Sequence, residues 1–306
     1  MKKIRCVGFV GLGRMGWPMA GHLVRAGFDL VVYDVRDKVV SDFVAENGGR
    51  VADDLTGVGR GADAVVTMVP TSAHVREVVL GADGAGGVAG SLSEGAVVID
   101  TGASDPVQTR ALGEALRPRG VHVVDAPVAG GVAFARDGTL DVMVGGEPDV
   151  IERIRPVLDA FGSRVHTCGG LGNAHAMKAL NNYVNAAGIV ALVEALTVGR
   201  RLGLDLDMML ESIAAATTGR NHPLDKKILP QVITHRFAHG AAIGLMAKDV
   251  RIALDSAVAS GAWAPMAERC ASLWEEAVQV LGFDADQTEV ARLWEERTGV
   301  SLARED

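Results

Sequence analysis

Near its N-terminus the chain joins an apolar run to a glycine-rich turn and then to a helical pattern. The run Ile4–Val10 leads directly into Gly11, Gly13 and Gly16, which have the spacing G-x-G-x-x-G. In a strand–turn–helix unit the first glycine permits a tight turn, the second lets backbone approach a pyrophosphate, and the third allows the helix to pack on the strand. Because the helix N-terminus also directs N–H groups at the turn, this segment predicts a dinucleotide-binding α/β domain.

The second predicted strand, Leu30–Tyr33, ends in Asp34, roughly 20 residues beyond the glycines. A carboxylate there accepts hydrogen bonds from the adenosine ribose and repels a 2′-phosphate, which favours NAD. Arg36 leaves NADP open, because an arginine at this point can bind that phosphate. The cofactor-binding residues predicted from this motif are Gly11, Gly13, Arg14, Met15, Gly16 and Asp34.

The first half of the chain alternates apolar strands with amphipathic helices, which is typical of a doubly wound parallel sheet covered on both faces. After about Val165 we expect helices alone. We therefore predict a Rossmann-type domain over residues 1–167 and an all-helical domain over residues 168–306. The predicted strands are Ile4–Val10, Leu30–Tyr33, Ala64–Val69, Ala96–Asp100, Val121–Asp125 and Leu140–Gly145. The main predicted helices of the second domain span residues 173–202, 205–216, 222–233, 245–260, 265–281 and 286–298.

The first of these helices is about 45 Å long at the usual helical rise. A helix of this length bridges two domains or packs against a second subunit, so we expect a homodimer or homotetramer.

The net charge of −8 argues against a nucleic-acid partner. The three cysteines lie far apart without metal-ligand spacing, as expected of a reducing cytoplasm. No segment is long and apolar enough to predict a membrane span. His235 and His239 have metal-like spacing but lack a convincing third ligand, so we predict no metal.

Between Val165 and Val193 the one formally charged residue is Lys178, inside a long apolar helix pattern. A buried lysine is costly unless it is paired or its pKa falls, and a depressed pKa makes it a general acid/base. The alternative is a lysine that extends along the helix to solvent. Asn182 lies four residues later and therefore shares its helix face.

Three further stretches carry a resemblance to a known family. They are Asp125–Gly131 followed by Gly138–Gly146, then Gly172–Asn182, then Lys248 with Asp249. Together with the glycine turn, and in this order along nearly the whole length, they resemble the β-hydroxyacid dehydrogenases. The resemblance implies a Rossmann-type domain, a long interdomain helix, a helical C-terminal domain that mediates oligomerisation, and NAD(P)-linked interconversion of a small 3-hydroxyacid with its aldehyde or keto acid.

The resemblance also implies residue roles. Lys178 matches the catalytic lysine, and Asn182 matches the asparagine that supports it and touches substrate. The remaining implied positions are the carboxylate-binding loop Ala129, Gly130 and Gly131, the cofactor contacts Val69, Pro70 and Thr101, and the pair Lys248 and Asp249, which closes over the nicotinamide end. Lys248 is thus implied to contact both cofactor and substrate.

Two departures concern the substrate pocket. Ala129 stands where the family usually has serine, which removes a hydroxyl donor to the carboxylate, and Gly240–Gly244 lacks an aromatic residue often found before Lys248. From the residues alone, Arg220 is either a bidentate anion ligand in a helix loop or a solvated charge.

Other functions remain open at this point. An NADPH-dependent imine-reducing relative commonly lacks the lysine, so Lys178 and Asp34 speak against it. A phosphosugar dehydrogenase would need a longer C-terminal domain and more basic residues. A non-catalytic dinucleotide-binding scaffold would have no reason to keep Lys178 in an apolar helix.

Overall fold

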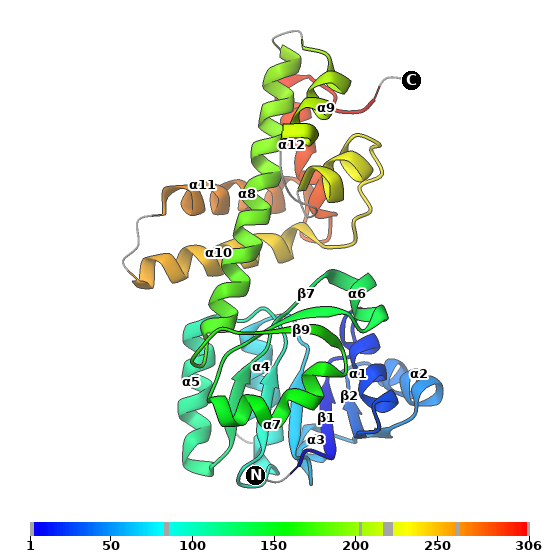
Figure 1. The fold of residues 1–306 in the computed structure, drawn as a ribbon, viewed down its shortest axis with the longest axis vertical. Helices are drawn as coiled ribbons and strands as arrows, with labels where there is room; N and C mark the ends of the chain where they lie inside the picture. Colours follow the sequence, from blue (N-terminus) through cyan, green and yellow to red (C-terminus); the bar gives the residue numbers. More distant parts are fainter. Residues whose placement is uncertain (1–2, 83–85, 202–203, 217–222, 261–263, 305–306) are drawn as a thin grey trace. The chain divides into compact units, whose positions relative to one another are not determined.

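The computed structural model describes residues 3–82, 86–201, 204–216, 223–260 and 264–304. The chain divides into two compact units, Met1–Lys178 and Ala179–Asp306 (Figure 1). The long helix α8, Asn173–Arg201, contributes its first residues to one unit and the rest to the other. The domain boundary predicted between residues 167 and 168 stays a prediction.

The first unit is built on a six-stranded sheet with strand order β3-β2-β1-β4-β5-β6. Each neighbouring pair is parallel. The order reverses between β1 and β4, as in a Rossmann sheet, and ligands bind such sheets where the order reverses at the carboxyl ends of the strands. The predicted fold class is confirmed. The strands are β1 Cys6–Val10, β2 Asp29–Tyr33, β3 Arg50–Val51, β4 Ala64–Thr67, β5 Val97–Asp100 and β6 His122–Asp125.

Side chains alternate along these strands between two hydrophobic cores, as the period of a β-strand requires. Phe9 and Val66 face the core formed with helices α1, α2 and α7, whereas Val65 and Val98 face the core formed with α3, α4 and α5. Burial on both faces explains why the strands are continuously apolar. The helices and short 3₁₀ turns of this unit are α1 Gly16–Arg25, α2 Asp37–Asn47, α3 Leu55–Gly59, α4 Ser72–Leu80, η1 Val88–Gly90, α5 Pro106–Leu116, η2 Arg117–Arg119, α6 Gly131–Asp137 and α7 Pro148–Asp159.

The sixth predicted strand, Leu140–Gly145, does not join the parallel sheet. It forms β8, Leu140–Val144, in a separate sheet of order β7-β8-β9. β8 pairs antiparallel with β7, Val128–Ala129, and parallel with β9, Gly162–Thr167. The expectation of helices alone after about Val165 is therefore wrong by two residues, because β9 continues to Thr167. That strand is missed because it is a largely exposed edge strand of sequence GSRVHT, without an apolar run.

The described part of the second unit is helical around one core that includes Ile189, Val232, Val250 and the fully buried Trp274. Its elements are α8 from Ala179 onward, α9 Leu206–Ala216, the π-helix η3 Leu224–Val232, α10 Ile243–Ser260, α11 Pro265–Leu281, the 3₁₀ turn η4 Gln287–Val290 and α12 Ala291–Thr298. None of the helices in the described ranges is long and apolar enough to cross a membrane.

Two predicted helices differ in detail. The segment predicted as 222–233 is a π-helix rather than an α-helix, and it contains Pro230. Proline lacks the N–H that an α-helical turn needs, so the turn around it cannot close with the usual bonds. The segment predicted as 286–298 starts with η4, where Asp286 and Glu289 form a reciprocal capping box.

Candidate active site

The three glycines after β1 have three different structural roles. Gly11 has a φ of 100°, and a Cβ there would clash with the carbonyl oxygen of Met68. A Cβ on Gly16 would clash with the carbonyl oxygen of Gly11. Gly13 differs from both, because no heavy atom of the described chain beyond its neighbours lies within 4 Å of its Cβ position. The space above Gly13 is what a pyrophosphate needs to reach the backbone.

Helix α1 begins at the end of this turn. Its first turn is closed by the N–H of Trp17, which donates to the carbonyl oxygen of Gly13 at 2.9 Å. Met15 occupies the N-cap position, where its thioether does not cap the helix, and the exposed Arg14 precedes it. The first N–H groups of α1 and the positive end of its dipole therefore favour an anion at this turn.

Asp34 follows β2 and is almost fully buried. Its Oδ2 accepts a hydrogen bond from the N–H of Leu12 at 2.8 Å, and Arg36 donates from Nε to Oδ1 at 2.8 Å and from Nη2 to Oδ2 at 3.1 Å. Burial raises the pKa of Asp34, but the hydrogen bonds from Arg36 and Leu12 outweigh it, so the pKa lies below the ordinary value. The carboxylate is thus ionised near neutral pH, as a ribose-binding acid must be.

A cavity of about 440 Å³ lies beside these residues. It is lined by Gly11, Gly13, Asp34, Arg36, Val69, Pro70 and others from β1, β2 and the segment after β4. The structure therefore brings together five of the predicted cofactor-binding residues: Gly11, Gly13, Asp34, Val69 and Pro70. Thr101 is not among the lining residues: it is buried, and its hydroxyl donates to the carbonyl oxygen of Thr67 at 2.7 Å. Its side chain therefore connects the end of β5 to β4 by a hydrogen bond.

Lys178 and Asn182 lie four residues apart in α8 and are both half-buried. Within the second unit Asn182 contacts α10: its Nδ2 donates to Oδ2 of Asp249 at 2.5 Å. Asp249 also forms an ion pair with Lys248, with 3.1 Å between Nζ and Oδ1. The structure thus brings Asn182, Lys248 and Asp249 of the predicted site together, although α9 and η3 lie between them in the sequence.

The loop after β6 contains the predicted carboxylate-binding residues. Ala129 ends β7 and pairs with Asp141 of β8, while Gly130 and Gly131 follow with φ of 123° and 78°. Two successive residues with positive φ are possible here because both are glycines. Both are exposed, so their backbone groups are accessible to a ligand.

Two family models match the chain almost end to end. Residues 6–170 match the NAD-binding domain of 6-phosphogluconate dehydrogenase, and residues 172–294 match the domain described as NAD-binding of NADP-dependent 3-hydroxyisobutyrate dehydrogenase. The chain is 32% identical to 2-(hydroxymethyl)glutarate dehydrogenase of Eubacterium barkeri over 99% of each chain. The chain belongs to the β-hydroxyacid dehydrogenase family.

Other family members give the same result. NAD-dependent L-serine dehydrogenase of Pseudomonas aeruginosa is 32% identical, with 96% of this chain and 99% of that protein covered. The solved structure of Mycobacterium tuberculosis 3-hydroxyisobutyrate dehydrogenase with L-serine has a TM-score of 0.81 at 29% identity, covering 95% of this chain and 99% of that one. The recognised family is confirmed, and the cavity beside Asp34 lies in its NAD-binding domain.

Arg220 lies outside the described residues. Within the described ranges, no cluster of three or more His, Cys, Asp or Glu side chains could hold a metal ion. His235 instead pairs with Glu295, with 2.9 Å between Nε2 and Oε1.

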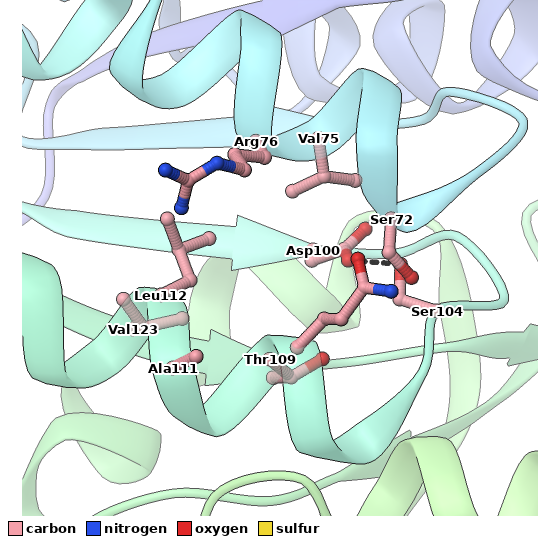
Figure 2. A pocket seen from close by; sticks show the side chains of 10 residues that line it. Ser72, Val75, Arg76, Asp100, Ser104, Thr109, Ala111, Leu112 and Val123 are labelled. Carbon is pink, nitrogen blue, oxygen red and sulfur yellow. Dashed lines mark hydrogen bonds between the residues drawn. The ribbon is translucent and has the colours of Figure 1, made fainter. Parts of the chain in front are cut away.

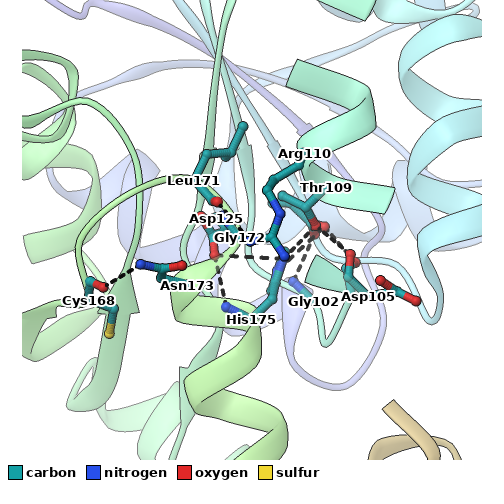
Figure 3. A network of polar contacts seen from close by, with 12 residues as sticks. Gly102, Asp105, Thr109, Arg110, Asp125, Cys168, Leu171, Gly172, Asn173 and His175 are labelled. Atoms are coloured by element: carbon teal, nitrogen blue, oxygen red, sulfur yellow. Dashed lines mark hydrogen bonds and ion pairs between the residues drawn. The ribbon is translucent and has the colours of Figure 1, made fainter. Parts of the chain in front are cut away.

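Sequence reasoning missed a buried polar network at the start of α8 (Figure 3). Asp125, at the end of β6, is 0% exposed and accepts hydrogen bonds from the N–H groups of Gly172 and His175. Nδ1 of His175 lies 2.8 Å from Oγ1 of Thr109, and this histidine is buried. An acid at the end of a buried strand was the available signal for Asp125.

His175 also lies beside Asp100, with 3.6 Å between Nε2 and Oδ2. Asp100 lines a smaller cavity of about 220 Å³ between α4 and α5 (Figure 2). There it accepts a hydrogen bond from the hydroxyl of Ser104 at 2.6 Å. The ends of β5 and β6 are therefore tied to the start of α8 by buried side chains.

Proposed function

We propose that this protein is an NAD-dependent dehydrogenase that interconverts a small 3-hydroxyacid with the corresponding aldehyde or keto acid. The observation that carries the proposal is that Lys178 and Asn182 lie one turn apart on one helix, with Asn182 bonded to Asp249, in a chain that also has the complete dinucleotide turn. A scaffold protein would need the turn alone. An acid/base lysine next to a neutral amide is what alcohol oxidation requires.

The residues of the first unit fit NAD. The open position above Gly13 and the uncapped start of α1 suit the pyrophosphate, and the ionised Asp34 suits the ribose hydroxyls. We assign cofactor contacts to the glycine turn with Arg14 and Met15, to Val69 and Pro70, and to Thr101 and Lys248. When bound, NAD supplies the hydride acceptor.

The chain's own residues transfer the proton and bind the substrate carboxylate. In oxidation, neutral Lys178 takes the proton from the substrate hydroxyl as hydride leaves the same carbon; in reduction its ammonium returns a proton to the new alkoxide oxygen. Asn182 orients the substrate oxygen without adding charge. The N–H groups of Gly130 and Gly131 bind the substrate carboxylate, supported by their positive φ and exposure.

The remaining substrate contacts are assigned by the same reasoning. Arg220 and Lys248 supply positive charge for an anionic substrate, while Asp249 holds Asn182 in place. Ala129 offers no hydroxyl at the loop.

The reaction is tested with a panel of hydroxyisobutyrate, glycerate, serine, threonate and a sulfonate analogue. We expect NADH formation at alkaline pH with at least one of the 3-hydroxyacids, followed by absorbance at 340 nm. Tight NAD binding with no turnover across the panel would instead favour the scaffold function.

Asp34→Ala is expected to lower kcat/KM for NAD. Losing two hydrogen bonds to a charged group costs about 3 kcal/mol or less, which corresponds to a factor of ten to a hundred. The same variant should gain activity with NADP relative to NAD, because the repelling charge is gone and Arg36 is released from its ion pair. Measuring kcat/KM with both cofactors checks this, and a wild-type enzyme that prefers NADP would contradict it.

Ala129→Ser is expected to lower KM for the preferred hydroxyacid by about fivefold, since one added hydrogen bond to a carboxylate contributes about 1 kcal/mol. The value of kcat should change little, because the carboxylate is bound equally in ground state and transition state. Initial-rate kinetics measure both. An unchanged KM would show that residue 129 does not face the carboxylate.

For assembly we propose a homodimer or homotetramer. Apolar side chains of the helical unit are strongly exposed in the single chain: Val184 of α8 is 68% exposed and Val258 of α10 is 71% exposed. We also propose a cytoplasmic location, supported by the three free thiols. Light scattering of the purified chain tests the first proposal, and fractionation of the source cells tests the second.

A further inference from the structure

Asp125 is tied by its side chain to the start of the lysine helix. Its Oδ1 accepts the N–H of Gly172 and its Oδ2 accepts the N–H of His175, both at 2.8 Å (Figure 3). These are N–H groups at the helix N-terminus, which have no partner inside the helix. A buried carboxylate at this end also interacts favourably with the helix dipole. Lys178 follows His175 by three residues, so it lies one turn beyond this anchor.

The backbone of Asp125 pairs with Gly145, the residue directly after β8. Its N–H donates to the carbonyl oxygen of Gly145 at 3.1 Å, and its carbonyl accepts the N–H of Gly145 at 2.8 Å. A Cβ on Gly145 would lie 2.6 Å from Oδ1 of Asp125. Glycine at this point therefore leaves room for the carboxylate to reach α8. The loop to Gly131 follows directly in the chain.

The His175 ring adds a second anchor to the same turn of α8. Its side chain is 0% exposed, and Nδ1 lies 2.8 Å from the hydroxyl of Thr109 in α5. Rotation or sliding of α8 would break this contact together with the two bonds to Asp125. The first turn of the lysine helix is thus fixed to β6 and to α5.

We propose that Asp125 is a positioning residue, which sets the place of Lys178 relative to the carboxylate-binding loop. The inference rests on the proposed function, in which Lys178 transfers the proton. A substrate held by its carboxylate presents its hydroxyl at a fixed distance from the loop. Lys178 meets that hydroxyl only if the helix and the loop keep their spacing. Asp125 is hydrogen-bonded to the start of the helix, and the chain continues from it directly into the loop.

Asp125→Asn is the first test. An amide keeps one acceptor oxygen but turns an NH₂ group toward the second N–H, so one hydrogen bond and the charge are lost. Misplacing a reacting group by about 1 Å can cost up to a hundredfold, so we expect kcat to fall about ten- to a hundredfold. The dissociation constant of NAD, from fluorescence titration, should not change, because the anchor does not touch the dinucleotide turn.

A double-mutant cycle separates positioning from general damage. If Asp125 acts through Lys178, then Asp125→Asn should have no further effect on the residual rate of Lys178→Ala, measured at high enzyme concentration. An equal loss from Asp125→Asn with and without Lys178 would overturn the positioning role. Near-normal turnover of Lys178→Ala alone would overturn the proposed function instead, so the two failures are distinguishable.

Asp63→Asn is the matched control. Asp63 is also buried, and its Oδ2 accepts two backbone N–H groups, from Arg5 at 2.9 Å and Cys6 at 3.1 Å. It precedes β4 and therefore lies at the opposite edge of the sheet from Asp125, which ends β6. An amide oxygen can keep both of these bonds, so we expect only the loss of stability that comes from removing a buried charge bonded to N–H groups, with kcat close to wild type. An equal fall of kcat in both variants would show that the effect of Asp125 is only structural.

Amide hydrogen exchange of the segment containing residues 170–178 gives an independent readout. It should speed up in Asp125→Asn and stay unchanged in Asp63→Asn. A fall in kcat without faster exchange there would contradict action through the helix terminus. If Asp125→Asn does not fold, Gly145→Ala is the second variant: its methyl group would lie 2.6 Å from Oδ1 of Asp125 and 2.8 Å from the carbonyl oxygen of Gly170, so it separates the carboxylate from the start of α8 while the charge is kept.

Discussion

Lys178→Ala is expected to lower kcat by at least about two orders of magnitude, the usual contribution of a positioned acid/base group. Affinity for NAD should remain close to that of the wild type, because the dinucleotide turn and Asp34 lie elsewhere in the first unit. Steady-state kinetics with the best hydroxyacid give kcat, and fluorescence titration gives the dissociation constant. Near-normal turnover would remove Lys178 from the mechanism.

Lys178→Arg is the matched variant for this experiment. A guanidinium keeps the positive charge and much of the length of the side chain, but it does not release its proton in proteins. We therefore expect it to be nearly as inactive as Lys178→Ala. Substantial activity in the arginine variant would mean that residue 178 acts through its charge and not by proton transfer.

Gly13→Val is expected to weaken NAD binding by at least about a hundredfold. A side chain here fills the space through which the pyrophosphate reaches the backbone, and losing two hydrogen bonds to a charged group costs about 3 kcal/mol. The fold should tolerate the change, because the Cβ position is open and φ is not positive. We expect the melting temperature without cofactor to change by no more than about 3 °C.

Gly90→Val is the control for this substitution. Gly90 also has an open Cβ position, but it ends η1 and does not line the cavity beside Asp34. It should leave both NAD affinity and kcat unchanged. Tight NAD binding by Gly13→Val would show that the pyrophosphate does not cross this glycine.

Much of the first unit was predictable because its signals are local. The turn at Gly11 and the acid at Asp34 each follow a buried strand, and the packing of Gly16 on Gly11 depends on residues close in sequence. The helical nature of the second half, including the start of α8 at Asn173, was likewise visible from its period. The family resemblance supplied the roles of Lys178 and Asn182, which remain predictions to be tested.

The errors arise where pairing is decided at long range. β8 is apolar enough for the main sheet, yet it pairs with β7 and β9 instead. The strand β9 has no apolar run to reveal it. Long-range pairing also decides the partner of the Thr101 hydroxyl, which donates to the backbone of β4, while the cofactor contact of Thr101 stays a prediction.

The sequence by itself determined a Rossmann-type domain, a helical domain and a lysine of unusual setting, because turns, periodicity and charge placement are properties of neighbouring residues. The tertiary structure decided what holds that lysine. Asp125 and His175 are separated by fifty residues and three further strands, and no local pattern tells which N–H groups a buried carboxylate will accept. Their contact forms because a charged group can leave water only where hydrogen-bond donors replace it, and the start of α8 provides those donors.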